Sequence, residues 1–148
     1  MPLPLVRPPD SPACLRACFA LMRTLRPHLV DEADFLARIE RMRAQRYALL
    51  AVWEGSLPLA LAGYRYQENL IYGHFLYVDD LVTHADRRGE QHGARLLRAL
   101  EATAREAGCA RLVLDTGLAN ALAQRFYFRA GLLSGAMRFD KSLGGSAA

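Results

Sequence analysis

The stretch from Asp79 to Leu97, DDLVTHADRRGEQHGARLL, constrains the fold of this chain more than any other. It begins as a strand, passes through a basic loop that contains Gly89, and continues with the apolar spacing of an amphipathic helix. The first turn of a helix carries backbone N–H groups without intrahelical acceptors, and such groups attract phosphate. The stretch therefore predicts a strand, a loop and a helix with an anion site at the start of the helix.

The residues after this stretch complete a crossover. Apolar positions with helical spacing run from Arg88 to Ala107, and Gly108 is expected to end the helix. The short apolar run from Ala110 to Asp115 predicts a buried strand. A strand, a helix and a strand in this order form a right-handed crossover with the two strands parallel. We expect a ligand at the carboxyl edge of these strands.

The chain before the crossover predicts two helices and then antiparallel strands. Ser11, followed by Pro12, and Asp31 are expected to cap the two helices, and Pro27 is expected to stop the first. The predicted strands are a short edge strand at Leu3–Val6, a hairpin of Tyr47–Trp53 with Leu57–Tyr66, and a strand within Leu70–Thr83.

The C-terminal part predicts one helix and one strand. The helix is expected over Leu118–Ala130, closed by Gly131, and the alternation over Ala136–Leu143 indicates a final strand. The chain shows no internal repeat and no linker, and 148 residues suit one core better than two. We therefore expect a single mixed α/β domain over residues 1–148.

The composition excludes several classes of function. The net charge of +4 is almost entirely arginine, since Lys141 is the only lysine, and an overall Arg and Ala bias explains it without nucleic-acid binding. Cys14, Cys18 and Cys109 lack the spacing of a zinc site and are expected to be small core residues in a reducing compartment, so no metal is expected. No signal peptide or run of roughly 20 apolar residues is present, so we expect a cytoplasmic protein with no membrane partner.

The loop RRGEQHGA lacks the glycine spacing of a dinucleotide fingerprint, and no Gly-Lys-Ser/Thr of a P-loop follows it. It is therefore interpreted as an anion site at a helix start. Gly89 and Gly93 permit close approach of the backbone, while Arg87 and Arg88 add positive charge. The alternative is a structural turn with exposed arginines, and the residues alone leave both open.

A second group of polar residues lies in the last predicted helix. Asn120, Ala123 and Tyr127 are spaced so that they share one helix face. A tyrosine on this face can donate a proton. The alternative, which the residues alone favour, is an aromatic residue at the edge of the core with its hydroxyl in water.

These motifs together resemble the GNAT superfamily of acetyl-CoA-dependent N-acetyltransferases. The strand YVDDLVT, the loop RRGEQHGARLL, the strand ARLVLDTG and the helix NALAQRFYFRAGL follow one another as that superfamily's core motifs do, over roughly Tyr77 to Leu132. The order of two helices and a hairpin before them also fits. The resemblance implies a twisted mixed sheet with helices on both faces, a central strand–helix–strand crossover, and acetyl-CoA as co-substrate.

The resemblance also implies individual roles. The residues expected at the cofactor's diphosphate are Arg88, Gly89, Glu90, Gln91, His92, Gly93 and Ala94. The backbone of Leu81, Val82 and Thr83 is expected to pair with the pantetheine arm as an added strand. Asn120 would hold this arm and Tyr127 would protonate the departing thiolate. Gln91 stands where the superfamily's pattern has its first glycine, so the loop must keep its shape without that freedom.

The chemistry also needs a base, because a protonated amine cannot attack a thioester. Asp79 and Asp80 are the candidates, and as consecutive strand residues they are expected on opposite faces. The pattern Tyr-x-acid-acid resembles acetyltransferases of small polyamines, which favours Asp79. A water chain is an alternative to direct contact. The weaker candidates for the base are His74, His84, His92 and Glu68.

We therefore expect an N-acetyltransferase that moves an acetyl group from acetyl-CoA directly to an amine of a small molecule or peptide in a ternary complex. No cysteine is placed to act as a nucleophile. The alternative is a non-catalytic acyl-CoA-binding regulatory or interaction protein. Exposed strand edges are compatible with a homodimer.

Overall fold

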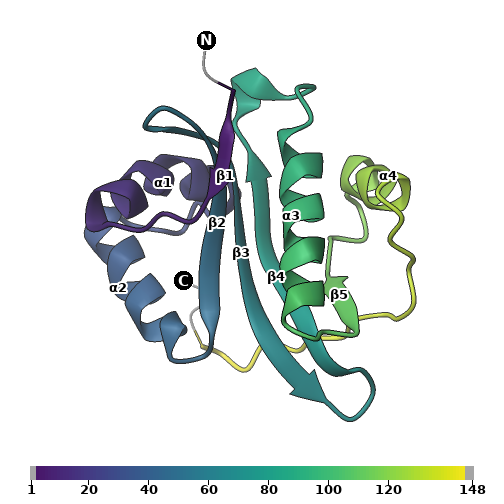
Figure 1. Ribbon diagram of the computed structural model, residues 1–148. Coiled ribbons are helices and arrows are strands. Elements are labelled where there is room, and N and C mark those ends of the chain that lie inside the picture. Colours follow the sequence, from purple (N-terminus) through teal and green to yellow (C-terminus); the bar gives the residue numbers. More distant parts are fainter. Residues whose placement is uncertain (1–2, 146–148) are drawn as a thin grey trace. The chain divides into compact units, whose positions relative to one another are not determined.

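Five strands form one sheet in the order β1-β2-β3-β4-β5 (Figure 1). Neighbouring strands are antiparallel from β1 to β4, and β5 is parallel to β4. A computed structural model describes residues 3–145. The strands are β1 (Leu5–Arg7), β2 (Tyr47–Glu54), β3 (Leu57–Asn69), β4 (Gly73–Thr83) and β5 (Arg111–Leu114). The mixed sheet and the parallel crossover confirm the predicted fold class.

The chain divides after Leu114 into two compact units. The first unit contains the sheet with helices α1 (Pro12–Leu25), α2 (Glu32–Arg43) and α3 (His92–Glu106) and the short 3-10 turn η1 (Ala85–Arg87). The second unit contains helix α4 (Ala121–Arg129). None of the helices in residues 3–145 combines the length and the apolar character that a membrane span requires.

The two N-terminal helices begin where their capping residues predict. The Ser11 hydroxyl accepts a hydrogen bond from the backbone N–H of Cys14, and Pro12 occupies the first turn. The Asp31 carboxylate accepts one from the N–H of Asp34. Each cap of this kind contributes roughly 0.5–2 kcal/mol to stability. Local sequence signals therefore position both helices.

The sheet carries a core on each face. On one face α1 and α2 pack against Tyr47, Leu49, Ala51 and Trp53, which alternate along β2. On the other face Leu96, Leu100 and Ala104 of α3 pack against strand residues such as Leu76 and Val78. Helices thus cover both faces, as predicted. Cys18 is fully buried in the first core, as expected of a small core residue, and burial raises the pKa of its thiol to about 12.

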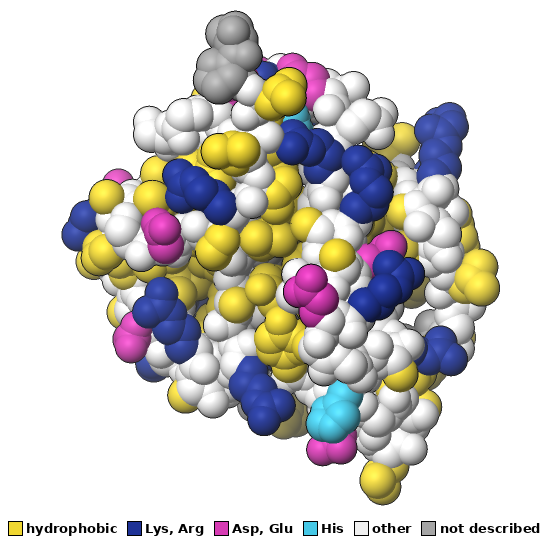
Figure 2. Space-filling view, viewed as in Figure 1, with side chains coloured by type: hydrophobic (Ala, Val, Ile, Leu, Met, Phe, Trp, Pro, Cys, Tyr) yellow, Lys and Arg dark blue, Asp and Glu magenta, His cyan; other side chains and the backbone are white. Residues whose placement is uncertain are grey.

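The basic side chains are spread over the surface. On the face shown in Figure 2, Arg and Lys side chains are interspersed with acidic ones and do not gather into one patch. Ion pairs such as Arg38 with Asp34 and Arg43 with Glu40 account for part of this mixing.

A β-bulge interrupts the pairing of β3 with β4. Gly63 pairs with Asp80 and Tyr64 with Val78, so Asp79 is the extra residue on β4. Val78 packs on the α3 side, whereas Val82, beyond the bulge, packs on the side of α1 and α2. The expectation that Asp79 and Asp80 point to opposite faces is wrong, because side-chain alternation holds only along a regular strand.

Gly63 makes room for the side chains that surround this bulge. A Cβ atom at this position would lie 1.9 Å from the Tyr47 hydroxyl oxygen and 2.4 Å from Oδ2 of Asp80. Both atoms belong to buried groups that hydrogen-bond to each other. Position 63 of β3 therefore cannot carry a side chain unless these buried groups move.

The predicted final strand over Ala136–Leu143 is absent, and this prediction is wrong. The backbone there is irregular, and the apolar side chains of Met137, Phe139 and Leu143 are exposed. Alternating sequence is not sufficient for a strand, because a strand also needs a neighbour to complete its hydrogen bonds. The predicted helix before it is confirmed in a shorter form, with Asn120 as its N-cap.

Substitution of Gly63 tests the requirement for space beside the bulge. Gly63→Ala should lower the free energy of unfolding by at least about 1–3 kcal/mol, because the added methyl overlaps two buried polar groups. Gly135→Ala is the control, since an added Cβ there meets open space, and a change within about 0.5 kcal/mol is expected. Urea denaturation of both variants measures the difference. Equal effects would show that the space beside Gly63 is not restricted.

Candidate active site

The edge of β4 is open beyond the end of β5. The pairing of β5 with β4 runs from Phe75 to Val78, where Val78 lies opposite Leu114. The half-buried residues Leu81, Val82 and Thr83 continue β4 past this point, and their other neighbour is β3. An extended ligand can therefore hydrogen-bond to this edge in the manner of an added strand.

The loop after β4 leads to the start of α3. The helix begins at His92, four residues later than Arg88 of the predicted range, because Gly89 and Gln91 have left-handed backbone angles. Gln91 is the N-cap residue, and its side chain makes no capping hydrogen bond. The first intrahelical bond joins the N–H of Arg95 to the carbonyl oxygen of Gln91 over 3.0 Å.

The backbone N–H groups of His92, Gly93 and Ala94 therefore have no acceptor within the helix. Arg88 is exposed beside them, and no ion pair of its guanidinium occurs within residues 3–145. Such a helix start favours an anion through both its free donors and its dipole. The start of α3 therefore has free N–H donors for an anion.

Gln91 adopts a backbone conformation that glycine reaches more easily than other residues. Its φ of 68° and ψ of 19° lie in the left-handed region. A residue with a Cβ costs roughly 1–2 kcal/mol there. The loop thus keeps its shape without glycine, at the expense of local strain.

Ion pairs hold this loop to the sheet. The Arg87 guanidinium donates to both carboxylate oxygens of Glu54, at 3.1 and 2.9 Å, and to both of Glu90, at 3.0 and 2.9 Å. These bonds to Arg87 lower the pKa of Glu54 and of Glu90. The charge of Arg87 is therefore already offset, and Arg87 serves to fasten the loop instead of adding charge at the anion site.

Glu90 also contacts the first helical residue. Its Oε1 lies 2.9 Å from Nε2 of His92, a residue that is only 4% exposed. The bulky ring of His92 thus anchors the start of α3 in the core. His92 was one of the weaker candidates for the base, and this contact gives its ring a structural role at the helix start.

Asp79 and Asp80 lie in one polar network on the same side of the sheet. Nε of Arg65 donates to Oδ2 of Asp79 over 2.9 Å, and the Arg65 guanidinium lies over the Tyr47 ring. The Tyr47 hydroxyl donates to Oδ2 of Asp80 over 2.6 Å. Nε of Arg26 donates to Oδ1 of Asp80 over 2.9 Å. Both oxygens of Asp80 are therefore engaged.

The two carboxylates differ in what they can do chemically. Burial raises the pKa of the Asp79 carboxyl, although the Arg65 guanidinium acts in the opposite direction. Burial and the Asp80 carboxylate raise the pKa of the Tyr47 hydroxyl, which therefore stays protonated and donates. A carboxylate with a raised pKa accepts a proton more readily, which suits Asp79 to general-base chemistry. Asp80 is suited to a structural role.

The second unit contains the other two predicted site residues. Oδ1 of Asn120 accepts a hydrogen bond from the N–H of Ala123 and so caps α4. Burial raises the pKa of the Tyr127 hydroxyl, which keeps it protonated near neutral pH. A protonated hydroxyl is the state that a proton donor needs.

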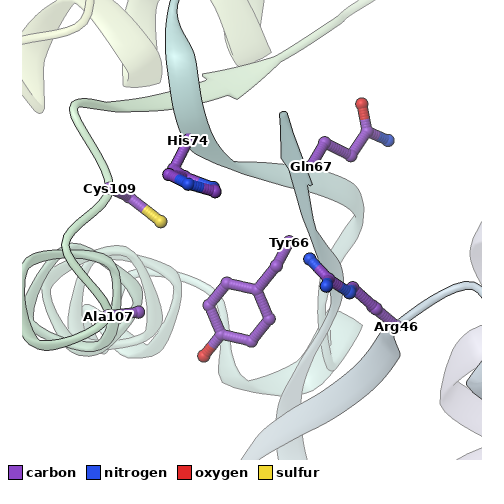
Figure 3. A pocket seen from close by; sticks show the side chains of 6 residues that line it. All are labelled: Arg46, Tyr66, Gln67, His74, Ala107 and Cys109. Atoms are coloured by element: carbon purple, nitrogen blue, oxygen red, sulfur yellow. The ribbon is translucent and has the colours of Figure 1, made fainter. Parts of the chain in front are cut away.

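The remaining candidates for the base have other partners. His84 accepts from the N–H of Asp86 at the start of η1. His74 pairs with Glu68 at the opposite end of β4, roughly 20 Å along the strand from Leu81. His74 also lines an open pocket of about 410 Å³ with Arg46, Tyr66, Gln67, Ala107 and Cys109 (Figure 3). His74 and Glu68 are therefore too far along the strand to act at the open edge.

The sequence matches the model of the Acetyltransferase (GNAT) family over residues 15–132. The chain belongs to the GNAT acetyltransferase family. It is 34% identical over 110 residues to the uncharacterized N-acetyltransferase YhdJ of Bacillus subtilis (strain 168), covering 74% of this chain and 77% of that one. This GNAT protein is accordingly assigned to the acetyl-CoA-dependent N-acetyltransferases, as its motifs indicate.

Solved structures share the fold. Glucosamine-6-phosphate N-acetyltransferase from Arabidopsis thaliana has a TM-score of 0.77 at 18% identity, covering 96% of this GNAT chain and 99% of that chain. The aminoglycoside N-acetyltransferase AAC(6')-Iy, in complex with the bisubstrate analog CoA-S-monomethyl-acetylneamine, has a TM-score of 0.82 at 15% identity, covering 95% of this chain and 99% of that chain. These similarities support the GNAT fold of this chain.

Sequence reasoning missed the residues that surround the two aspartates in this GNAT protein. Arg26, Tyr47 and Arg65 come from α1's C-terminal end, β2 and β3, and nothing in their local sequence indicates a polar network. Gly63 was the available signal, because an isolated glycine within a strand often marks a bulge or a close backbone approach.

The strain at Gln91 generates a prediction for stability. Gln91→Gly should raise the free energy of unfolding by about 0.5–1 kcal/mol, because relief of the left-handed strain exceeds the added entropy of the unfolded chain. Gln91→Val should lower it, since a β-branched residue is disfavoured at positive φ. Urea denaturation checks both. A destabilised glycine variant would mean that the Gln91 side chain makes a stabilising contact that outweighs its strain.

Proposed function

We propose that this chain binds acetyl-CoA along the open edge of β4 and at the start of α3, and transfers its acetyl group directly to an amine. The observation that carries this proposal is the continuity of two unpaired backbone regions. The open edge of β4 at Leu81–Thr83 leads through one loop to the free N–H groups of His92–Ala94. An extended arm that ends in a diphosphate matches both.

The loop residues would share the diphosphate contacts. Free N–H groups of His92, Gly93 and Ala94 would donate to phosphate oxygens, and Gly89, Glu90 and Gln91 would shape the backbone around them. Arg88 would add a charge-assisted contact. The pantetheine arm would pair with the backbone of Leu81, Val82 and Thr83, as an added strand does.

Asp79 is the proposed base. Its carboxylate lies at the bulge, next to the open edge, and burial raises its pKa. It would accept the proton of the acceptor ammonium either directly or through a water molecule. Asp80, with both oxygens engaged, would position Asp79 through the bulge instead of exchanging a proton.

Two residues of the second unit complete the proposed chemistry. Asn120 would hold the pantetheine arm through the NH2 group of its side-chain amide, because its Oδ1 already accepts the hydrogen bond that caps α4. Tyr127 would protonate the thiolate of CoA as it leaves, so that CoA departs as a neutral thiol. These two assignments rest on the match of the α4 sequence to the family's motif. They require residues 1–148 to work as one domain.

The acceptor would be an amine of a small molecule or a peptide. The named acceptors of the solved neighbours, glucosamine 6-phosphate and aminoglycosides, differ in charge, so the shared fold leaves the acceptor open. The alternative function is a non-catalytic acyl-CoA-binding regulatory or interaction protein. A homodimer through the outer strands β1 and β5 is compatible with either function.

Cofactor binding and turnover separate these functions. CoA at about 100 times its dissociation constant should stabilise the protein by about 2.7 kcal/mol. Acetyl-CoA with a panel of amines should release free thiol. An unchanged melting temperature at saturating CoA would contradict the proposed cofactor site. Binding without thiol release from any amine would favour the non-catalytic alternative.

A matched pair of arginine variants locates the site. Arg88→Ala should weaken CoA binding by about ten-fold, or roughly 1.4 kcal/mol. Arg98→Ala, which removes an exposed arginine farther along α3, should leave the affinity unchanged. Calorimetric titration with CoA measures both.

The pH dependence of the rate tests Asp79. The base must be deprotonated, so the acidic limb of the kcat profile should rise with increasing pH through the raised pKa of Asp79. Asp79→Asn should remove this limb and lower kcat by about 10²–10⁴-fold. Asp80→Asn should lower stability and retain the limb. Identical profiles for the two variants would show that neither aspartate is the sole base.

A further inference from the structure

The two aspartates of the site are paired with two arginines. Arg65 contacts Asp79 and Arg26 contacts Asp80, each over 2.9 Å. The formal charges of these four side chains therefore sum to zero. A cluster of this kind does not offer a polycationic amine the unpaired carboxylates that would attract it.

The four charged groups are not equally accessible. The Arg26 side chain is 42% exposed, compared with 23% for Asp79, 15% for Arg65 and 10% for Asp80. The outermost charge of the neutral cluster is therefore positive. Both acidic members are less exposed than Arg26.

Arg26 lies directly at the bulge. Its Nη2 donates to the main-chain carbonyl oxygen of Asp79 over 2.8 Å, and its Nε donates to Asp80. Among residues 3–145, its Nη1 makes no hydrogen bond and no ion pair. A guanidinium held by two of its nitrogens presents the third in a fixed direction.

We propose that the acceptor is an amine that carries an anionic group, a carboxylate or a phosphate, and that Arg26 recognises this group. The inference rests on the proposed function, in which the acceptor amine meets the thioester beside Asp79. There the anion would find the exposed guanidinium of Arg26, while the amine would reach Asp79. Arg26 is thus a specificity-determining residue for the acceptor.

Matched pairs of amines test the proposal by thiol release from acetyl-CoA. Tyrosine is compared with tyramine for the carboxylate, and O-phosphoethanolamine with ethanolamine for the phosphate. The anionic member of at least one pair should have a kcat/KM at least about ten-fold higher, mainly through a lower KM. The pair with the higher ratio identifies the anion. Equal or better rates with tyramine and ethanolamine would overturn the inference.

Substitutions assign the preference to Arg26. Arg26→Gln combined with Asp80→Asn removes both charges together, so no buried carboxylate is left unpaired, and the preference should fall toward unity. Arg23→Gln removes an exposed arginine of α1 that lies over Phe19, and it should retain the preference. An unchanged preference in the double variant would overturn the role of Arg26.

A measurement on the unaltered protein covers the case in which the double variant does not fold. Raising the salt concentration from about 0.05 to 0.5 M should reduce the preference for the anionic amine, because salt screens an exposed guanidinium. A preference that is insensitive to salt would overturn the charge-based explanation. Absence of thiol release with every amine, despite CoA binding, would overturn the proposed function and this inference with it.

Discussion

The β-bulge at Asp79 is the feature on which the rest of the site depends. It places two consecutive acidic residues on the same side of the sheet, and it lies where the pairing between β4 and β5 ends. Arg26, Tyr47 and the bare backbone of Gly63 hold it in place. One irregularity in one strand therefore creates the acidic cluster directly beside the open edge.

The loop after β4 depends on a comparable balance. Gln91 stores strain in a left-handed conformation, and strain of this kind persists only where surrounding contacts determine the backbone. Arg87 supplies such contacts by joining Glu54 of β2 to Glu90 of the loop, and Glu90 in turn meets His92. The strain and the ion pairs are parts of one arrangement, which presents the helix start without the usual glycine.

The sequence predicted the elements whose signals are local. Ser11 and Asp31 cap their helices as expected, and the strands β4 and β5 that α3 connects are parallel as expected. Both predictions succeeded because capping and apolar spacing act over a few residues. The bulge was not predictable in this way, since it depends on the register between β3 and β4. Arg26, which pairs with Asp80, and Glu54, which pairs with Arg87, lie 54 and 33 residues from these partners along the chain, and no spacing rule connects them. The absent strand at Ala136–Leu143 shows the converse, because alternation was present and a partner strand was not.

The charges around Asp79 explain how an ion-paired carboxylate can still serve as a base. Burial raises its pKa and Arg65 lowers it, and the net shift is upward. The pairing therefore fixes the position of the carboxylate without removing its affinity for a proton. The pattern Tyr-x-acid-acid resembles acetyltransferases of small polyamines, but in the structure each of the two acids is paired with a guanidinium. In the proposed function the acidic pair acts as a base and its support instead of attracting positive charge, and the exposed Arg26 selects the acceptor.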